Sequence, residues 1–98
     1  MVKHMIIWKF KDEVADKAAT ANEIKTALEG LVGKIDGLLE MHILTERFAC
    51  SAGDVMMDSS FVDAAALDFY QKHPLHQKIA NKLVRPVMQQ RLSFDYQA

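Results

Sequence analysis

The chain opens with a segment, Val2–Phe10, whose side chains alternate between two faces, with apolar groups on both. Period-two alternation is typical of a β-strand, in which successive side chains point to opposite sides. One face carries Val2, His4, Ile6, Trp8 and Phe10, and the other carries Lys3, Met5, Ile7 and Lys9. Such a strand belongs in a sheet that is covered on both faces, which constrains the fold of the whole chain.

A helix is predicted to follow this strand. Thr20 and Glu23 have the spacing of a capping box, in which each side chain bonds the backbone N–H of the other residue. Apolar residues then recur at helical spacing and form one stripe. They are Ile24, Leu28, Leu31, Val32 and Ile35. Gly33 and Gly37 are expected to bracket the end of this helix.

The rest of the chain continues to switch between strand and helix patterns. Strands are predicted over residues 38–47, 55–61 and 88–96. Asp63 is expected to cap a helix, and Pro74 ends that helix and begins a second helical segment. The order strand, helix, strand, strand, helix pair, strand predicts one α+β domain over residues 1–98. Its expected form is a ferredoxin-like four-stranded antiparallel sheet with helices on one face.

Helices cover only one face of such a sheet, so the opposite face stays open. Met5, Ile7, Met41 and Ile43 are expected to give this open face its apolar surface. Exposed apolar patches of this kind usually mark an interface. Two copies related by a two-fold axis can satisfy each other through the same patch. We therefore expect a homodimer in which sheet packs on sheet.

Composition excludes several classes of protein. The 98 residues carry 12 Lys and Arg against 13 Asp and Glu, a net charge of −1, which argues against nucleic-acid binding and a basic membrane anchor. No apolar run approaches the ~18 residues that a membrane span needs. Lys9 and Lys11 end the first apolar stretch too early for a signal peptide. We expect a cytoplasmic protein, and the lone Cys50 forms no internal disulfide.

The segment Tyr70–His76 is the most distinctive local feature. A bend at Pro74 can bring the phenol of Tyr70 and the imidazole of His76 together over the sheet. His76 lies in the first turn of the second helical segment, where the helix dipole favours a neutral ring that can accept or donate a proton. His73 falls at the N-cap of that segment and is expected to be structural. A purely structural role for Tyr70 in the core also remains open.

Further candidates lie on the strands, facing a pocket between sheet and helices. His4 shares a strand face with Trp8, and it is either a polar residue at the start of the strand or a donor or general base in the pocket. Arg91 and Asp95 share one face of the last strand. Arg91 is expected to pair either with Asp95 or with a ligand carboxylate, and Asp95 is expected to be structural.

No metal or cofactor site is expected. His73-x-x-His76 has the spacing of two metal ligands, but no third ligand lies nearby in the sequence. A glycine-rich phosphate loop, a nucleophile turn and paired cysteines are absent. Cys50 lies in a turn of small residues without a neighbouring histidine, so a nucleophilic role has no support.

Three segments together resemble a known family. The opening Val2–Asp12, the pattern Tyr70-x-x-His73-Pro74-x-His76 and the closing Phe94–Tyr96 are similar to segments of the stress-responsive A/B barrel domain (Dabb) proteins. These proteins are members of the dimeric α/β-barrel superfamily. The segments occur in the right order and span the whole chain. The resemblance implies two ferredoxin-like protomers whose sheets pack into one α/β barrel.

The resemblance also implies a chemistry. A plant polyketide cyclase of the family works without metal or organic cofactor through a histidine and a tyrosine, which match His76 and Tyr70, and a further pocket histidine matches His4. In such a site a neutral imidazole removes a proton beside a carbonyl and a phenol stabilises the enolate. The chain is polar around His76, with Gln77, Lys78 and Asn81. Arg91 and Ser93 are expected to make the pocket more hydrophilic than a cyclase of alkyl chains needs, so the substrate is not carried over.

Three functions remain open from the sequence. The first is a stress-responsive dimer that binds a small organic molecule in a pocket lined by His4, Trp8 and Arg91 beside Tyr70 and His76. The second is a cofactor-free enzyme, similar to a polyketide cyclase or a monooxygenase, in which His76 and Tyr70 are catalytic. The third is a structural or interaction dimer that catalyses no reaction, in which the histidines cap helices.

Overall fold

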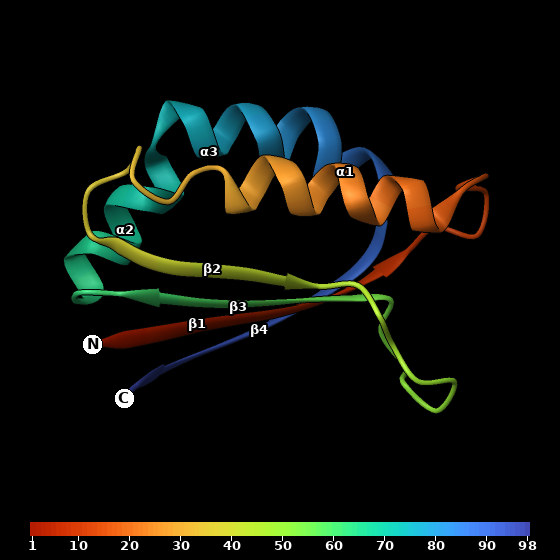
Figure 1. Ribbon diagram of the computed structural model, residues 1–98, viewed down its shortest axis with the longest axis horizontal. Helices are drawn as coiled ribbons and strands as arrows, with labels where there is room; N and C mark the ends of the chain where they lie inside the picture. The colour runs from red at the N-terminus through yellow and green to blue at the C-terminus, as the bar shows by residue number, and fades with distance from the viewer.

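Four antiparallel strands form one sheet, and the helices lie on one side of it (Figure 1). The computed structural model describes residues 1–98. The strands are β1 (Val2–Phe10), β2 (Leu38–Leu44), β3 (Val55–Phe61) and β4 (Met88–Gln97), in the spatial order β2-β3-β1-β4. The helices are α1 (Lys17–Glu29), α2 (Ala64–Lys72) and α3 (Pro74–Ile79), followed by a π-helical turn (Ala80–Val84) and a 3-10 turn (Arg85–Val87). The predicted ferredoxin-like order of elements is confirmed, and no helix is long and apolar enough to cross a membrane.

The first helix begins and ends earlier than its sequence pattern predicts. The carboxylate of Asp16 accepts a hydrogen bond from the backbone N–H of Ala19 at 3.0 Å and so caps α1. The predicted start at Thr20 is therefore wrong, because the better cap lies one turn upstream. The helix ends at Glu29, and the buried Leu31 and Ile35 belong to the turns that follow.

Strand β2 places its apolar side chains on the opposite face from the one predicted. A register shift between Leu38 and Glu40 inserts an extra residue into the pairing of β2 with β3. A shift of one residue moves all the following side chains to the other face of a sheet. Met41 and Ile43 are consequently buried under the helices, and the prediction that they lie on the open face is wrong.

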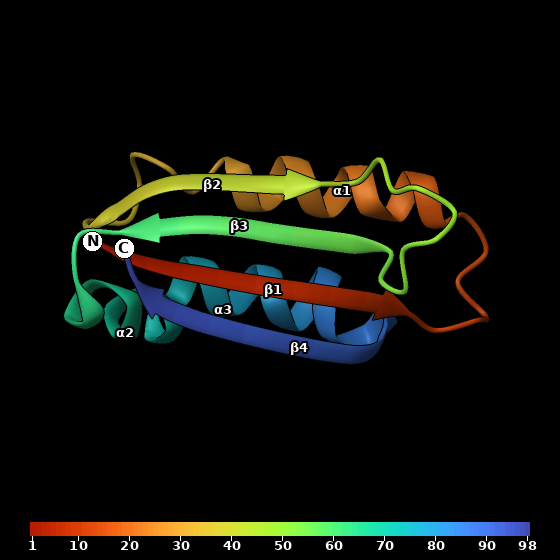
Figure 2. The ribbon, with the colours of Figure 1, turned by 90° about the horizontal axis from the view of Figure 1, so that it is seen from below.

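The sheet face away from the helices is apolar where β1 and β4 pair. Ile7 lies opposite Leu92, and Met5 lies opposite Phe94. Leu92 is 61% exposed and Phe94 is 70% exposed, so this apolar surface has no cover within the chain. Figure 2 shows this face with no helix in front of it. The open face is therefore present, and β2 contributes Leu44 to it in place of Met41 and Ile43.

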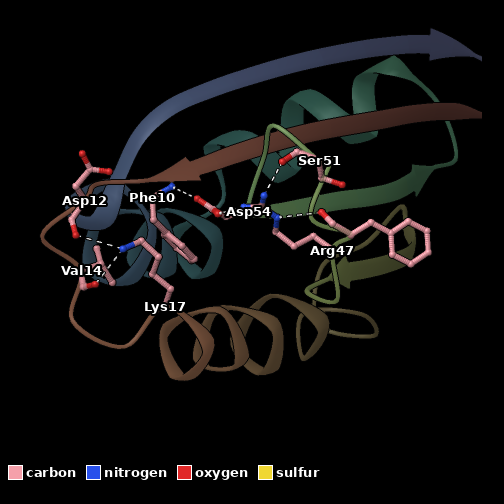
Figure 3. Close-up of polar contacts among 8 residues, drawn as sticks. Phe10, Asp12, Val14, Lys17, Arg47, Ser51 and Asp54 are labelled. Carbon is pink, nitrogen blue, oxygen red and sulfur yellow. Dashed lines mark hydrogen bonds and ion pairs between the residues drawn. The ribbon is translucent and has the colours of Figure 1, made fainter.

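The connection between β2 and β3, residues 45–54, extends to the open side of the sheet (Figure 1). Arg47 holds it in shape by donating to the Asp54 carboxylate at 2.7 Å and to the Ser51 carbonyl at 2.6 Å (Figure 3). The other oxygen of Asp54 accepts the N–H of Phe10 at 2.9 Å. These bonds attach the loop to the end of β1. They also explain why β2 ends at Leu44 and not, as predicted, at Arg47.

Candidate functional site

A cavity of ≈ 390 Å³ lies between the sheet and the segment formed by α2, α3 and the π-helical turn. Its volume falls in the range of about 300–1,000 Å³ that is typical of small-molecule sites. The sheet contributes His4, Ile6, Trp8, Met57 and Arg91, and the helical side contributes Tyr70, Gln71, His76, Gln77, Val84 and Arg85 among others. The five residues that the sequence predicted for a pocket or a catalytic role all line this one cavity.

A break between two helices brings Tyr70 and His76 into contact. His73 has extended backbone angles, ends α2 and caps α3, where its Nδ1 accepts the N–H of Leu75 at 3.1 Å. Pro74 then begins α3 in a new direction. As a result, the rings of Tyr70 and His76 lie with centroids 4.3 Å apart and planes tilted by 36°. His73 itself does not line the cavity.

Two buried donors at the cavity have no hydrogen-bond partner within the protein: the hydroxyl of Tyr70 and the indole N–H of Trp8. Both side chains are almost fully buried and line the cavity. Buried polar groups nearly always find a partner, since an unpaired one costs about 1–3 kcal/mol. Burial also raises the pKa of the Tyr70 phenol, which keeps its proton at neutral pH. The two unpaired donors therefore belong to residues that line the same cavity.

His76 is held in a form that can accept a proton. Its Nδ1 lies 3.3 Å from the carbonyl oxygen of Gln71, which accepts the Nδ1–H and leaves the lone pair on Nε2. Burial lowers the pKa of His76 below its usual value, although the bond to Gln71 raises it. The nearby charges of Arg85 and Arg91 lower this pKa further. The ring is therefore neutral near pH 7.

A second histidine on the cavity wall is tied to a carboxylate. His4 is buried, and its Nδ1 bonds Asp95 Oδ1. The pairing of β1 with β4 sets this contact, since His4 and Asp95 lie directly opposite each other. A carboxylate on Nδ1 fixes the tautomer and orientation of the ring and directs the lone pair to Nε2, which is the arrangement that general bases use.

The two arginines of the cavity differ in their contacts. Arg85 Nη1 bonds Asn81 Oδ1 and lies 3.4 Å from Gln77 Oε1. Arg91 forms no hydrogen bond or ion pair in the chain, whereas Asp95 is bound to His4. Arg91 therefore does not pair with Asp95, one of the two partners that the sequence left open for it.

Sequence reasoning missed two polar residues of the cavity, Gln71 and Arg85, and identified Gln77 only as a polar neighbour of His76. Gln77 bonds the same Gln71 carbonyl that His76 approaches. No motif marks these residues, but each lies within one or two turns of Tyr70, His76 or Val84 along the helices. No group of three or more His, Cys, Asp or Glu side chains is arranged to hold a metal ion.

The sheet order and the helices on a single face define a ferredoxin-like α+β protein. The model of the stress responsive A/B barrel domain (Dabb) family matches residues 2–98. The chain belongs to this family. Comparison with curated proteins found no match.

Solved structures share the fold over nearly the whole chain. A dimeric protein of unknown function with a ferredoxin-like fold from Bacteroides fragilis is 25% identical, with a TM-score of 0.90 over 99% of this chain and 95% of that one. The hydroxynitrile lyase from Passiflora edulis is 15% identical, with a TM-score of 0.78 over 97% and 90%. An antibiotic biosynthesis monooxygenase is 15% identical, with a TM-score of 0.77 over 100% and 98%. The last two likenesses show the fold alone.

Proposed function

We propose that this protein binds a small organic molecule in the cavity between its sheet and helices. The unpaired hydroxyl of Tyr70 and the unpaired indole N–H of Trp8 carry this proposal. Burial has removed both groups from water without giving them a hydrogen-bond partner, which costs free energy. A ligand with hydrogen-bond acceptors offsets that cost. A purely structural dimer has no need for two such groups beside one cavity.

The only tryptophan of the chain makes a direct test available. Trp8 lines the cavity, so a ligand that enters it changes the tryptophan fluorescence. A library of one- and two-ring compounds is titrated, and hits are confirmed by calorimetry. Ala80→Phe fills the cavity and is expected to abolish binding, whereas Ala65→Phe on the exposed face of α2 leaves it intact. Equal binding by both variants would place the ligand elsewhere and contradict the proposal.

A second candidate function is a cofactor-free enzyme that forms an enolate. The contact between Tyr70 and His76 supports it, together with the His4–Asp95 pair. In this hypothesis a neutral imidazole takes the proton beside a ligand carbonyl, and the phenol hydroxyl donates to the developing oxyanion. A hydroxynitrile lyase and a monooxygenase with the same fold show that it accommodates catalysis.

Proton exchange tests the enzyme hypothesis without knowledge of the product. NMR follows exchange of the α-protons of β-keto compounds in D₂O, with and without the protein. His76→Ala and Tyr70→Phe are expected to remove any acceleration while calorimetry still detects binding. Acceleration that survives both substitutions would contradict the roles assigned to His76 and Tyr70. Binding without any acceleration supports the binding function alone.

We propose further that two copies pack through their open sheet faces. The exposed apolar side chains on β1 and β4 support this homodimer, as does the dimeric Bacteroides fragilis protein of the same fold. The cavity lies on the other side of the sheet, so each protomer keeps its own binding site. The same arrangement closes two sheets into one barrel.

A further inference from the structure

The polar groups of the cavity favour a ligand that accepts hydrogen bonds. Trp8 Nε1–H can only donate, and the Arg91 guanidinium can only donate. The protonated phenol of Tyr70 adds a third donor. No Asp or Glu lies among the residues that line the cavity. The carboxylate of Asp95, on the strand next to His4, is bound to His4 Nδ1.

Arg91 is the arginine of the cavity whose guanidinium forms no hydrogen bond or ion pair in the chain. On the helix-facing side of the sheet it lies directly opposite Trp8 in the pairing of β4 with β1, which places guanidinium and indole on neighbouring strands of one wall. Arg85, the other arginine of the cavity, is bound to Asn81. The cavity thus combines an uncommitted positive charge with two unpaired buried donors, and it has no acidic group to balance them.

The remaining lining is apolar. Ile6 and Met57 extend from the sheet, and Leu28, Ala80 and Val84 face them from the helices. A ligand that fills this part needs an apolar body of one or two rings, because such a surface binds through burial and not through hydrogen bonds.

We propose that the cavity selects a small amphipathic organic acid, whose carboxylate pairs with Arg91 and whose apolar body lies against Ile6, Met57 and Val84. This inference rests on the proposed binding function and names its ligand class. A guanidinium binds a carboxylate through two parallel hydrogen bonds, a geometry that an amide or ester cannot match. Trp8 and Tyr70 donate to the remaining acceptors of the ligand.

Three probes share one apolar ring system and differ in the charge of the attached group, so they separate the effect of ligand charge on affinity from that of ligand shape. They are 1-naphthoate, 1-naphthamide and methyl 1-naphthoate. Calorimetry at pH 7.5 is expected to show that naphthoate binds about tenfold more tightly than either neutral compound. Arg91→Gln is expected to remove that preference, so that naphthoate and naphthamide bind with similar affinity. Lys82→Gln removes the same charge from the exposed surface and serves as the matched control. It is expected to keep the preference for the acid.

The outcomes distinguish this inference from the proposed function. Equal or tighter binding of the neutral compounds, sensitive to Ala80→Phe, would overturn the preference for acids and keep the binding function. A preference for naphthoate that survives Arg91→Gln would overturn the assignment to Arg91. No binding of any of the three probes, while compounds from the library still bind in a manner sensitive to Ala80→Phe, would overturn the ligand class and keep the binding function.

Discussion

The hydroxyl of Tyr70 is unpaired and buried, so its removal is expected to have opposite effects on the free energy of unfolding and on ligand affinity. Tyr70→Phe is expected to raise the free energy of unfolding by up to about 1 kcal/mol, because the variant no longer buries an unpaired donor. The same change should weaken ligand binding. Urea unfolding at fixed protein concentration measures the first effect and calorimetry the second. A loss of stability above about 1 kcal/mol would show that the hydroxyl has a partner in solution.

His76 makes stability depend on pH. Burial lowers its pKa in the folded protein below the 6.5 of an unfolded chain, so the unfolded state binds the proton more readily. The contribution of His76 to the free energy of unfolding is therefore greatest above pH 6.5 and falls as the pH decreases below it, until the pKa of the folded state is passed. Because the ring is only half-buried, the slope stays well below the limit of about 1.4 kcal/mol per pH unit.

His76→Gln should remove this part of the pH dependence. Urea unfolding of both proteins at several values between pH 7.5 and 5 gives the two slopes, at one protein concentration so that association does not contribute. The variant is expected to lose less stability over this range than the parent protein. Identical slopes would mean that the environment of His76 does not disfavour the charged ring.

The contact between Tyr70 and His76 could be predicted from the sequence, whereas the bond between His4 and Asp95 could not. The first depends on a local helix break, which Pro74 marks. The second joins residues 91 positions apart in the chain, and its geometry depends on the pairing of β1 with β4. A sequence pattern shows which face a residue shares with its neighbours, but not which residue lies opposite on another strand.

At the scale of elements, Glu29 joins α1 to the edge strand β2. Its Oε2 accepts the backbone N–H of Ile43 at 2.9 Å and the ammonium of Lys25 at 2.8 Å. Burial alone would raise the pKa of Glu29, but these two bonds outweigh it and hold the pKa below its usual value. The carboxylate therefore stabilises the attachment of β2 above about pH 4.5, and this stabilisation is lost as the pH falls through the lowered pKa.

Glu29→Ala leaves the N–H of Ile43 without its partner and is expected to cost about 1–3 kcal/mol of unfolding free energy. Glu29→Gln keeps an acceptor and should lose less than Glu29→Ala. Asp68→Ala breaks the exposed pair with Lys72 and is the matched control, with an expected loss of about 0.5 kcal/mol or less. Urea unfolding compares the three variants. A loss for Glu29→Ala no greater than that for the control would show that the helix–strand attachment does not depend on this carboxylate.

For α1 and β2 the structure differs from the sequence-based prediction, and in both elements the difference depends on contacts that local sequence spacing does not determine. The start of α1 depends on a choice between two caps, Asp16 and Thr20, which local spacing does not decide. The face on which the side chains of β2 lie depends on the register shift after Leu38. A regular alternation of apolar and polar residues does not predict such a shift. The existence and order of the elements were predictable because hydrophobic periodicity extends over many residues.

On the scale of the whole molecule, the two-sided pattern of β1 corresponds to two different surfaces. Its even-numbered side chains build the core and the cavity, and its odd-numbered side chains lie on the open face. The polar face of β4, with Arg91, Ser93 and Asp95, also has an explanation. The strand lies at the edge of the sheet, so its helix-facing side chains stay exposed at the mouth of the cavity and beside it.

The open face predicts a specific response of the quaternary structure. Phe94→Asp places a charge opposite Met5, where burial against a second copy would leave it unpaired, a penalty of several kcal/mol. Sedimentation at micromolar concentration is expected to give twice the 11.1 kDa chain mass for the parent protein and a single chain mass for this variant. Phe69→Asp, on the exposed face of α2, makes the same chemical change away from the sheet and should stay dimeric.

Ligand binding by Phe94→Asp and Phe69→Asp tests whether the cavity depends on the dimer. The residues that line the cavity lie on the helix side of the sheet, and Phe94 points to the opposite side. Monomeric Phe94→Asp should therefore bind the same ligands with similar affinity wherever it remains folded, although it unfolds at a lower urea concentration. A parent protein that sediments as a monomer would contradict the dimer. A folded Phe94→Asp monomer that loses binding would show that the partner copy supports the cavity through the sheet.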